Sequence, residues 1–223
     1  MSSCKARRCR SHDVTMKSIQ PDKILNDIRR LKNDLDKFGL TIPPSLVGIY
    51  GELLAYQKIK RLFGPRGYKV VLGAGQSKAD IQLIKQDTKI NVEVKTSRLK
   101  DEWYGKGYGF AINIKKCKTH EDKRFKHPKK GELSGDFCYF DCVVAVVLLR
   151  NLNNHEFYVF PKSFIEKNEK FLRNRNARFN SSTHRIIFAV EPKTTSELTS
   201  FDKRLSKTRS KYKNAWHALR GST

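Results

Sequence analysis

Two runs of the sequence predict the centre of the fold: Asp80-Ile81-Gln82-Leu83-Ile84 and, after five polar residues, Ile90-Asn91-Val92-Glu93-Val94-Lys95. Apolar and polar residues alternate in both runs, which is typical of β-strands with one buried face. The alternation puts Glu93 and Lys95 on the same face of the second strand. Residues 85–89 are polar and predict a hairpin loop, so we expect an antiparallel pair of strands that brings Asp80 near Glu93 and Lys95.

A third acidic residue, Glu52, belongs to a helix predicted from Leu46 to Phe63. Glu52 shares one side of this helix with Tyr56, Ile59 and Phe63, so its carboxylate has largely apolar neighbours. A glutamate that only adds solubility more often lies on a polar face. We therefore treat Glu52 as a candidate site residue.

Three carboxylates and one amine form a set suited to phosphodiester hydrolysis with a divalent metal ion. Mg²⁺ prefers oxygen ligands and keeps several of its waters, and Asp80 and Glu93 offer such oxygens. A metal so held polarises a phosphoryl oxygen, helps to generate hydroxide and steadies the leaving oxygen. Lys95 is expected to position the attacking water and to offset charge on the phosphorus. Glu52 is expected to hold a metal-bound water or a second ion.

Each part of this set also has an ordinary structural explanation. A Glu-x-Lys pair on an alternating strand is most often a solvated sheet face with a weak ion pair. What favours a site is the conjunction of helix Glu, strand Asp and Glu-x-Lys in that order within 44 positions, on a strongly basic chain.

Gly51-Glu52, Ala79-Asp80 and Glu93-Val94-Lys95 resemble the motif of the PD-(D/E)XK nuclease superfamily. The resemblance covers about 46–95, and it departs from the family at Ala79, where Pro is usual. It implies an α/β fold: a mixed central β-sheet flanked by helices, a restriction-endonuclease-like core that continues to strands near Val190. An N-terminal helix and a C-terminal helical extension are expected on either side of that core.

The same resemblance implies roles for the four residues. Asp80 and Glu93 are expected to be the metal ligands, Lys95 the catalytic amine, and Glu52 the acid from the first core helix, which we also count among the metal-binding candidates. Mg²⁺ is the expected cofactor, and Mn²⁺ is expected to substitute for it.

Composition points to a polyanionic partner. The chain has 223 residues with 46 Lys and Arg against 22 Asp and Glu, a net charge of +24, and 38% hydrophobic residues are enough for a sizeable core. We expect double-stranded DNA as the partner and no membrane association, because there is no clear amphipathic membrane helix. The start of the chain lacks an apolar core and the apolar run 142–149 is too short for a membrane span, so a cytoplasmic protein is expected.

Zinc is not expected. The odd count of five cysteines indicates reduced thiols. Cysteine and histidine do gather in one region, but their spacings match no common zinc motif. The residues concerned are Cys117, His120, His127, Cys138 and Cys142.

A basic stretch follows the candidate site. Residues 115–130 hold eight Lys and Arg against Glu121 and Asp122, and Pro128 and Gly131 indicate a mobile loop. Charge runs are usually solvated faces, but beside a phosphodiesterase site this one is the best candidate for phosphate contacts. The aromatic and glycine-rich run 103–110 fits either base stacking or a core strand. The candidate DNA-binding residues are Lys106, Lys115, Lys116, Lys118, Lys123, Arg124 and Lys126.

Three regions are predicted along the chain: a basic tail and helix over 1–45, a nuclease-like core over 46–195 with a basic insertion at 100–136, and a basic C-terminal helical extension over 196–223. The first helix, from about Asp22 to Phe38, is followed by Gly39. Its apolar stripe is expected to pack on the core, with a partner contact or a lid on the DNA side as the alternatives. The stripe consists of Ile24, Ile28, Leu31, Leu35 and Phe38.

The later elements follow from alternation and capping signals. A buried strand is predicted over 140–149, with a neighbour over 156–160 that completes the sheet. Ser163 and Glu166 form a capping pattern that predicts a helix towards Arg175, followed by a strand from His184 to Val190. A helix is expected after Ser196, with core, dimer and DNA contacts all open.

The sequence best fits a Mg²⁺-dependent endonuclease of the type II restriction kind, a homodimer that cuts a short palindrome. The preference rests on the length of chain beyond the minimal core, because fold alone does not fix the substrate. A structure-selective Holliday junction resolvase or DNA-repair nuclease is the alternative among enzymes. A non-catalytic nucleic-acid-binding protein is the alternative from another class.

Overall fold

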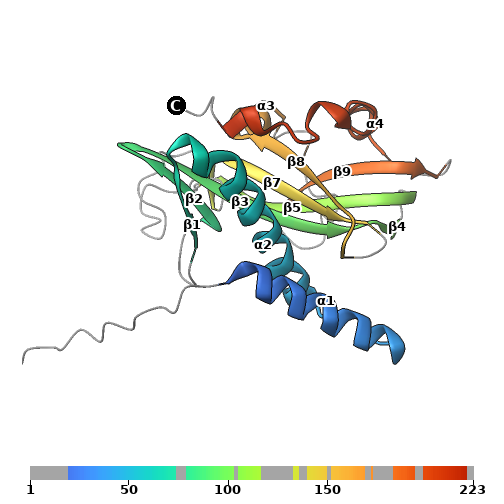
Figure 1. Cartoon of the computed structure of the whole chain (residues 1–223). Coiled ribbons are helices and arrows are strands. Elements are labelled where there is room, and N and C mark those ends of the chain that lie inside the picture. Colours follow the sequence, from blue (N-terminus) through green and yellow to red (C-terminus); the bar gives the residue numbers. More distant parts are fainter. Residues whose placement is uncertain are drawn as a thin grey trace, which may run out of the picture.

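The computed structural model describes residues 20–73, 79–102, 105–116, 133–135, 140–149, 152–168, 172, 183–193 and 198–219. Helix α2 (Pro44–Phe63) covers one face of a central sheet, with α1 (Pro21–Lys37) packed beside α2, and a second sheet with further helical segments covers the other face (Figure 1). None of the helices in this part of the chain combines the length and apolar character that a membrane span requires. The α/β class predicted from the sequence is confirmed.

The central sheet has five strands in the order β1-β2-β3-β7-β8. Only β3 and β7 run parallel, and the other neighbours are antiparallel, so the sheet is mixed as expected. Every residue of β7 is buried, because both faces of this strand are covered. The strands are β1 (Lys69–Leu72), β2 (Ile81–Lys85), β3 (Thr88–Arg98), β7 (Cys142–Leu148) and β8 (His155–Pro161).

The hairpin of β2 and β3 forms as predicted, with a shorter loop. Lys85 pairs with Thr88, so only Gln86 and Asp87 make the turn, and Gln86 has φ +50°. The polar residues at the ends of the expected loop belong to the strands, because the edge of a hairpin projects into water and needs no apolar side chains.

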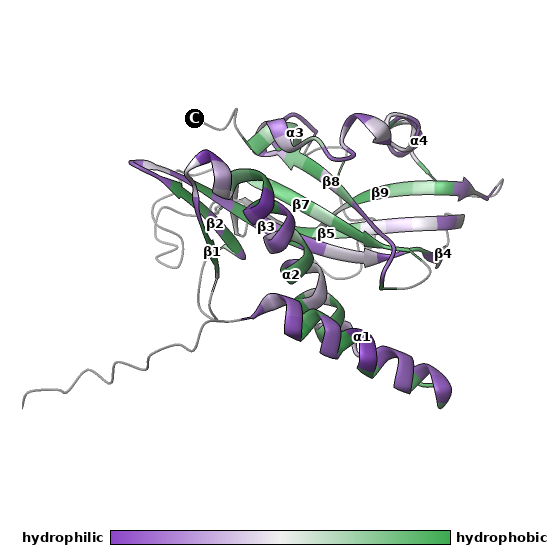
Figure 2. Ribbon diagram, viewed as in Figure 1, coloured by the Kyte–Doolittle hydropathy of each residue, from purple (hydrophilic) through white to green (hydrophobic). Residues whose placement is uncertain are grey.

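Helices α1 (Pro21–Lys37) and α2 (Pro44–Phe63) both begin with proline, whose fixed φ suits the first helical turn. Helix α2 buries apolar residues against the face of the sheet that carries Val92 and Val94 (Figure 2). After it, a 3-10 turn, η1 (Gly64–Arg66), leads to β1.

The stripe predicted on α1 is only partly covered. Leu25 and Ile28 are buried against the core that includes α2, and Leu35 packs partly against it. Ile24, Leu31 and Phe38 are exposed, so the expectation that the whole stripe packs on the chain itself is wrong. The buried face of α1 is turned towards Leu25, a position outside the predicted stripe.

A second sheet corrects the expectation of a single one. Strand β5 (Gly105–Lys116) pairs with β4 (Lys100–Glu102), with β6 (Leu133–Gly135) and with β9 (Thr183–Pro192), and none of these joins the central sheet. Tyr108 and Phe110 of β5 are buried in the core between the two sheets, so these two aromatic residues belong to the core. Trp103 and Tyr104 lie outside the described residues.

The later helices differ from their predicted limits. Helix α3 (Lys162–Asn168) begins one residue before Ser163, so Ser163 is not the residue that precedes the helix. In the C-terminal region, α4 (Ser200–Lys207) is capped by Thr199 and Asp202, and two 3-10 turns follow it. The turns are η5 (Arg209–Lys211) and η6 (Trp216–Leu219). The expected C-terminal helix is therefore helical only in short pieces, and the three predicted regions stay a prediction.

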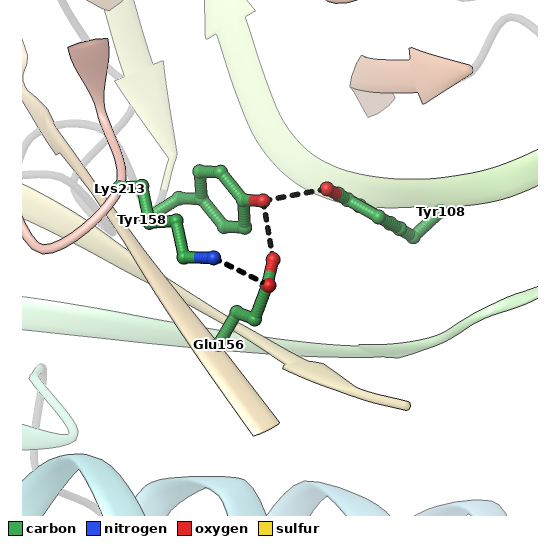
Figure 3. Close-up of polar contacts among 4 residues, drawn as sticks. All are labelled: Tyr108, Glu156, Tyr158 and Lys213. Atoms are coloured by element: carbon green, nitrogen blue, oxygen red, sulfur yellow. Dashed lines mark hydrogen bonds and ion pairs between the residues drawn. The ribbon is translucent and has the colours of Figure 1, made fainter. Parts of the chain in front are cut away.

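The C-terminal segment is tied to β8 by a chain of polar contacts (Figure 3). The Tyr158 hydroxyl donates to Glu156 at 2.6 Å and lies 2.7 Å from the Tyr108 hydroxyl, and Lys213 donates to Glu156 at 2.6 Å. A backbone hydrogen bond joins the same two segments, because the Val159 N–H donates to the Tyr212 carbonyl at 2.9 Å. This segment packs on the core, so the core contact is confirmed, while the dimer and DNA contacts stay predictions.

Tyr158→Phe is expected to lower the free energy of unfolding by about 1–3 kcal/mol, because Glu156 and the Tyr108 hydroxyl each lose a buried hydrogen-bond partner. Urea denaturation followed by circular dichroism measures the change. Tyr56→Phe is the matched control, since within the described residues the Tyr56 ring lies over Lys60 and its hydroxyl has no hydrogen bond. Equal stability of both variants would contradict the role of the network.

Candidate active site

The hairpin brings Asp80 to the middle of β3. Ile81 pairs with Val92, so Asp80, one residue before β2, stands across from Glu93. The backbone N–H of Val94 donates to Asp80 Oδ2 at 2.7 Å, which fixes the carboxylate against β3. Partial burial and a main-chain hydrogen bond together hold this acidic side chain in one position, which is what a ligand or catalytic group needs.

Glu93 and Lys95 lie on the same face of β3, as alternation predicts. Only 9% of Glu93 is exposed, and its Oε1 forms an ion pair with the Lys95 ammonium. Such a buried carboxylate is rare unless it is paired. The pair sits next to the core of the molecule and is not a solvated surface contact of the kind that a Glu-x-Lys strand usually carries.

Glycine 51 allows α2 to approach β3 closely. A Cβ atom at Gly51 would lie 2.8 Å from Cγ2 and 2.9 Å from Cβ of Thr96, both too close for real side chains. The next residue on the helix is Glu52. The close crossing of helix and strand is therefore what sets the height of the Glu52 side chain over the sheet.

Electrostatic coupling joins the four side chains. The pKa of Glu52 is raised to about 7: burial is the largest cause, the negative charges of Asp80 and Glu93 add to it, and the Lys95 ammonium partly opposes them. Three acidic groups share one basic group. The hairpin brings Asp80, Glu93 and Lys95 together, and Glu52 on α2 is coupled to them electrostatically. The four residues carry an excess of negative charge that a cation would relieve.

The donor chemistry of the cluster fits Mg²⁺. Within the part of the chain that the structure describes, no group of three His, Cys, Asp or Glu side chains is arranged so that it could hold a metal ion. Mg²⁺ needs fewer, because it is usually bound by one or two carboxylates and completes its octahedron with water and phosphate oxygens. Asp80 and Glu93 on paired strands meet that requirement, and a role for Glu52 through a bound water stays a prediction.

Zinc fits less well. Of the Cys and His residues considered for it, Cys142 is described; it is fully buried in β7, and burial raises the pKa of its thiol well above the usual range. A thiol that resists ionisation is a poor metal ligand. The other four residues of that set, 117, 120, 127 and 138, lie outside the described residues.

A groove of about 590 Å³ is lined by chain neighbours of the cluster, although none of the four cluster residues lines it. Gly48 stands one helical turn before Glu52 on the same side of α2, and Thr96 directly follows Lys95 on β3. Gly109 and Ala111 on β5 leave the groove open on that side, because their side chains are absent or short, and two basic residues border it. Its lining is Ile42, Pro44, Val47, Gly48, Thr96, Ser97, Arg98, Lys100, Gly109, Ala111 and Ile187.

Arg98 and Lys100 are basic residues that the sequence analysis missed. The Arg98 guanidinium donates to the Ile42 carbonyl at 3.3 Å, and burial lowers the pKa of this group. Their positions, three and five residues after Lys95 on a strand run, were a signal in the sequence. Their place in the groove depends on Ile42 and on β5, which local patterns do not connect.

The predicted DNA-binding residues are described only in part. Lys106 forms a cross-strand ion pair with Glu191 at 3.2 Å on the surface. Lys115 and Lys116 belong to the end of β5 and so correct the expectation that the loop begins there; nothing is described of their side chains. Lys118, Lys123, Arg124 and Lys126 lie outside the described residues. The DNA-binding role of all seven stays a prediction.

Glu52→Gln is expected to stabilise the metal-free protein more at pH 8 than at pH 5. A carboxyl whose pKa is higher in the folded protein, here about 7 against 4.5, contributes stability below pH 4.5 that is lost as the pH rises through 7. The glutamine side chain of the variant does not ionise, so the variant loses no stability at this position as the pH rises. Thermal unfolding in EDTA at pH 5, 6.5 and 8 measures the difference.

The control for this experiment is Glu166→Gln, an exposed residue of α3 far from the cluster in sequence. Its midpoint should follow the wild type at every pH. If the gap between Glu52→Gln and wild type stayed constant from pH 5 to pH 8, Glu52 would not carry the raised pKa.

No protein-family model matches the sequence, and no curated protein matches it. Among solved structures, the chain is similar to the bacterial homing endonuclease I-Ssp6803I, with 20% identity and a TM-score of 0.45, over 80% of this chain and 93% of that one. It is also similar to MepB, with 13% identity and a TM-score of 0.33, over 71% of this chain and 93% of that one. These similarities are too weak to assign a function.

Proposed function

We propose that this protein is a Mg²⁺-dependent endonuclease that hydrolyses phosphodiester bonds in double-stranded DNA. The observation that carries the proposal is the coupled cluster of Glu52, Asp80, Glu93 and Lys95, drawn from a helix and two paired strands. A surface ion pair would need neither the buried Glu93 nor an acidic residue held opposite it. The weak structural similarities above contribute nothing to this proposal.

Each residue of the cluster has its own proposed role in hydrolysis. Bound Mg²⁺ supplies Lewis-acid chemistry at a phosphoryl oxygen and makes a bound water more acidic. Asp80 and Glu93 hold the ion, and the Val94 N–H keeps Asp80 in place. Lys95 orients the attacking water and offsets negative charge that grows on the phosphoryl group. Glu52 accepts a hydrogen bond from a water at the edge of the cluster.

The substrate is proposed to be DNA because of charge and shape. A net charge of +24 attracts a polyanion, and the groove is lined by Thr96, the residue after Lys95, together with the basic residues Arg98 and Lys100. We propose that the groove receives one DNA strand and that these two residues contact its phosphates. Short residues in the lining, Gly48, Gly109 and Ala111, let the strand approach the backbone.

Among DNA endonucleases we propose a type II restriction enzyme that is cytoplasmic and acts as a homodimer on a palindrome. The second sheet with β5 and β9 extends well beyond the hairpin that holds the cluster, and it supplies surface for reading bases. Two copies related by a two-fold axis would place one cluster on each strand of a symmetric site.

Digestion of plasmid and phage DNA tests the proposal. Purified protein is incubated with each DNA in Mg²⁺, in Mn²⁺ and in EDTA, beside the Asp80→Ala variant, and the fragments are separated on a gel. We expect discrete bands with either metal and none in EDTA or with the variant. Cleavage of branched DNA alone would replace the restriction proposal with a junction resolvase. Metal-independent binding without cleavage of any DNA would overturn nuclease function.

Removing the two basic residues of the groove is expected to weaken DNA binding. The test uses an Asp80→Asn background with Ca²⁺, in which DNA is bound but not cut. There the double variant Arg98→Ala, Lys100→Ala should make the slope of log K against log [salt] shallower by about 2, since each phosphate contact contributes about 0.9 to that slope. Fluorescence anisotropy from 50 to 300 mM NaCl measures it. The double variant Lys203→Ala, Lys211→Ala removes the same charge from exposed positions outside the groove, and an equal loss there would contradict the groove assignment.

A further inference from the structure

Helix α1 carries an apolar face that the described part of the chain leaves exposed. Ile24, Leu31 and Phe38 are 37%, 43% and 79% exposed. They are spaced seven residues apart, so they form one straight ridge along the helix, which we call the α1 ridge. The buried residues Leu25 and Ile28 lie to one side of this ridge. The opposite side of the helix carries no large apolar residue.

The position of α1 fits a helix that needs a second neighbour. Figure 1 shows α1 extending away from the body of the molecule, with α2 as its companion. A helix of 17 residues is marginal by itself in water and relies on packing for its stability. An amphipathic helix with one half of its apolar stripe covered and the other half exposed is a typical subunit contact.

The charge of α1 distinguishes it from the rest of the chain. Its 17 residues include five Lys and Arg and four Asp, a net charge of +1, on a chain whose total is +24. Next to the ridge run two acidic residues, Asp27 and Asp34, followed around the helix by a basic row at 23, 30 and 37. Two copies of this chain repel each other over most of their surface, but α1 carries both signs and so can face itself.

The acidic row also argues against other occupants. Asp27 and Asp34 lie between the ridge and the basic row, so the phosphates of DNA or of an anionic membrane seated on the ridge would meet these carboxylates first. A two-fold interface presents the same patch from both partners, so it requires a surface that is apolar at its centre and mixed in charge at its rim. The α1 ridge has both properties.

We propose that the α1 ridge is the contact through which two copies of this chain associate. Leu31, the middle residue of the ridge, lies at the two-fold axis, and Ile24 and Phe38 extend the contact on either side of it. Association covers the apolar residues that the single chain leaves in water. The inference concerns assembly and holds whether or not the protein cleaves DNA.

Sedimentation velocity of the full chain tests the inference. Wild type, of 25.8 kDa per chain, is expected to sediment as a dimer at micromolar concentration, and so is Asp80→Asn. The double variant Leu31→Glu, Phe38→Glu is expected to sediment as a monomer with an unchanged circular dichroism spectrum. The matched control is Asn26→Glu, Asn33→Glu, which adds the same charge to exposed positions of α1 off the ridge and should stay dimeric.

A milder variant protects the test against a folding defect. Leu31→Ala removes apolar contact without adding charge and is expected to raise the dimer dissociation constant about tenfold. A monomeric wild type would overturn the proposal. So would a ridge variant that stays dimeric, or a control variant that dissociates as readily as the ridge variant.

Discussion

Asp80→Asn is expected to reduce the rate of DNA cleavage at least about a hundredfold, the loss typical of removing one preorganised electrostatic contact. The asparagine keeps an oxygen that can accept the Val94 N–H bond, so the hairpin should stay intact. What it removes is the negative charge that Mg²⁺ needs. Binding of DNA is expected to be unchanged or tighter, because one repulsion of phosphate is gone.

Glu93→Gln and Lys95→Met complete the series with losses of similar size. Both keep the length of the side chain and remove its charge, and both break the ion pair between the two residues. Single-turnover cleavage in Mg²⁺ and mobility shift in Ca²⁺ separate chemistry from binding. Lys89→Met, on the same strand but exposed near the hairpin turn, is the control and should keep full activity. Full activity in any of the three cluster variants would mean that the site lies elsewhere.

The hairpin of the candidate site was predictable because its information is local. A strand with a two-residue period tells which side chains share a face, and the short polar loop tells which strand is its neighbour. Asp80, Glu93 and Lys95 therefore came together as expected. Glu52 required more, since a helix can rotate over a sheet, and only the close contact of Gly51 with Thr96 fixes that rotation.

The second sheet was not predictable from local pattern. Strands β5 and β9 each alternate correctly, but their pairing joins residues such as Tyr108 and Phe188, far apart in the chain. Alternation does not state which strand is the partner. The groove has the same origin, because Ile42, Arg98 and Ala111 meet only after this pairing and the packing of α2.

The prediction that the whole apolar stripe of α1 packs on its own chain was wrong for a related reason. Periodicity of 3.6 residues identifies an apolar face, but it does not distinguish residues covered by the same chain from residues left for a partner. Ile28 and Ile24 look alike in the sequence and differ in the structure, where the first is buried and the second is exposed. An apolar stripe wider than its own chain covers is itself information about assembly.

Gly51→Ala is expected to destabilise the protein by about 1–3 kcal/mol or more and to abolish cleavage, since an overpacked core forces its elements apart. Intrinsic helix propensity alone would predict a more stable protein, because alanine in a helix is more favourable than glycine by about 1 kcal/mol. The added Cβ meets Thr96, and α2 must move away from β3. That movement also displaces Glu52 from Asp80 and Glu93.

Gly48→Ala gives the matched control, because a Cβ at that position has nothing within 4 Å, and it is expected to stabilise the protein slightly. Thr96→Gly in the Gly51→Ala background removes the obstacle, and the double-mutant cycle from urea denaturation is expected to show a favourable coupling between the two sites. Partial recovery of cleavage should accompany it. Additive effects of the two substitutions would mean that the helix does not rest on Thr96, and that the position of Glu52 has another cause.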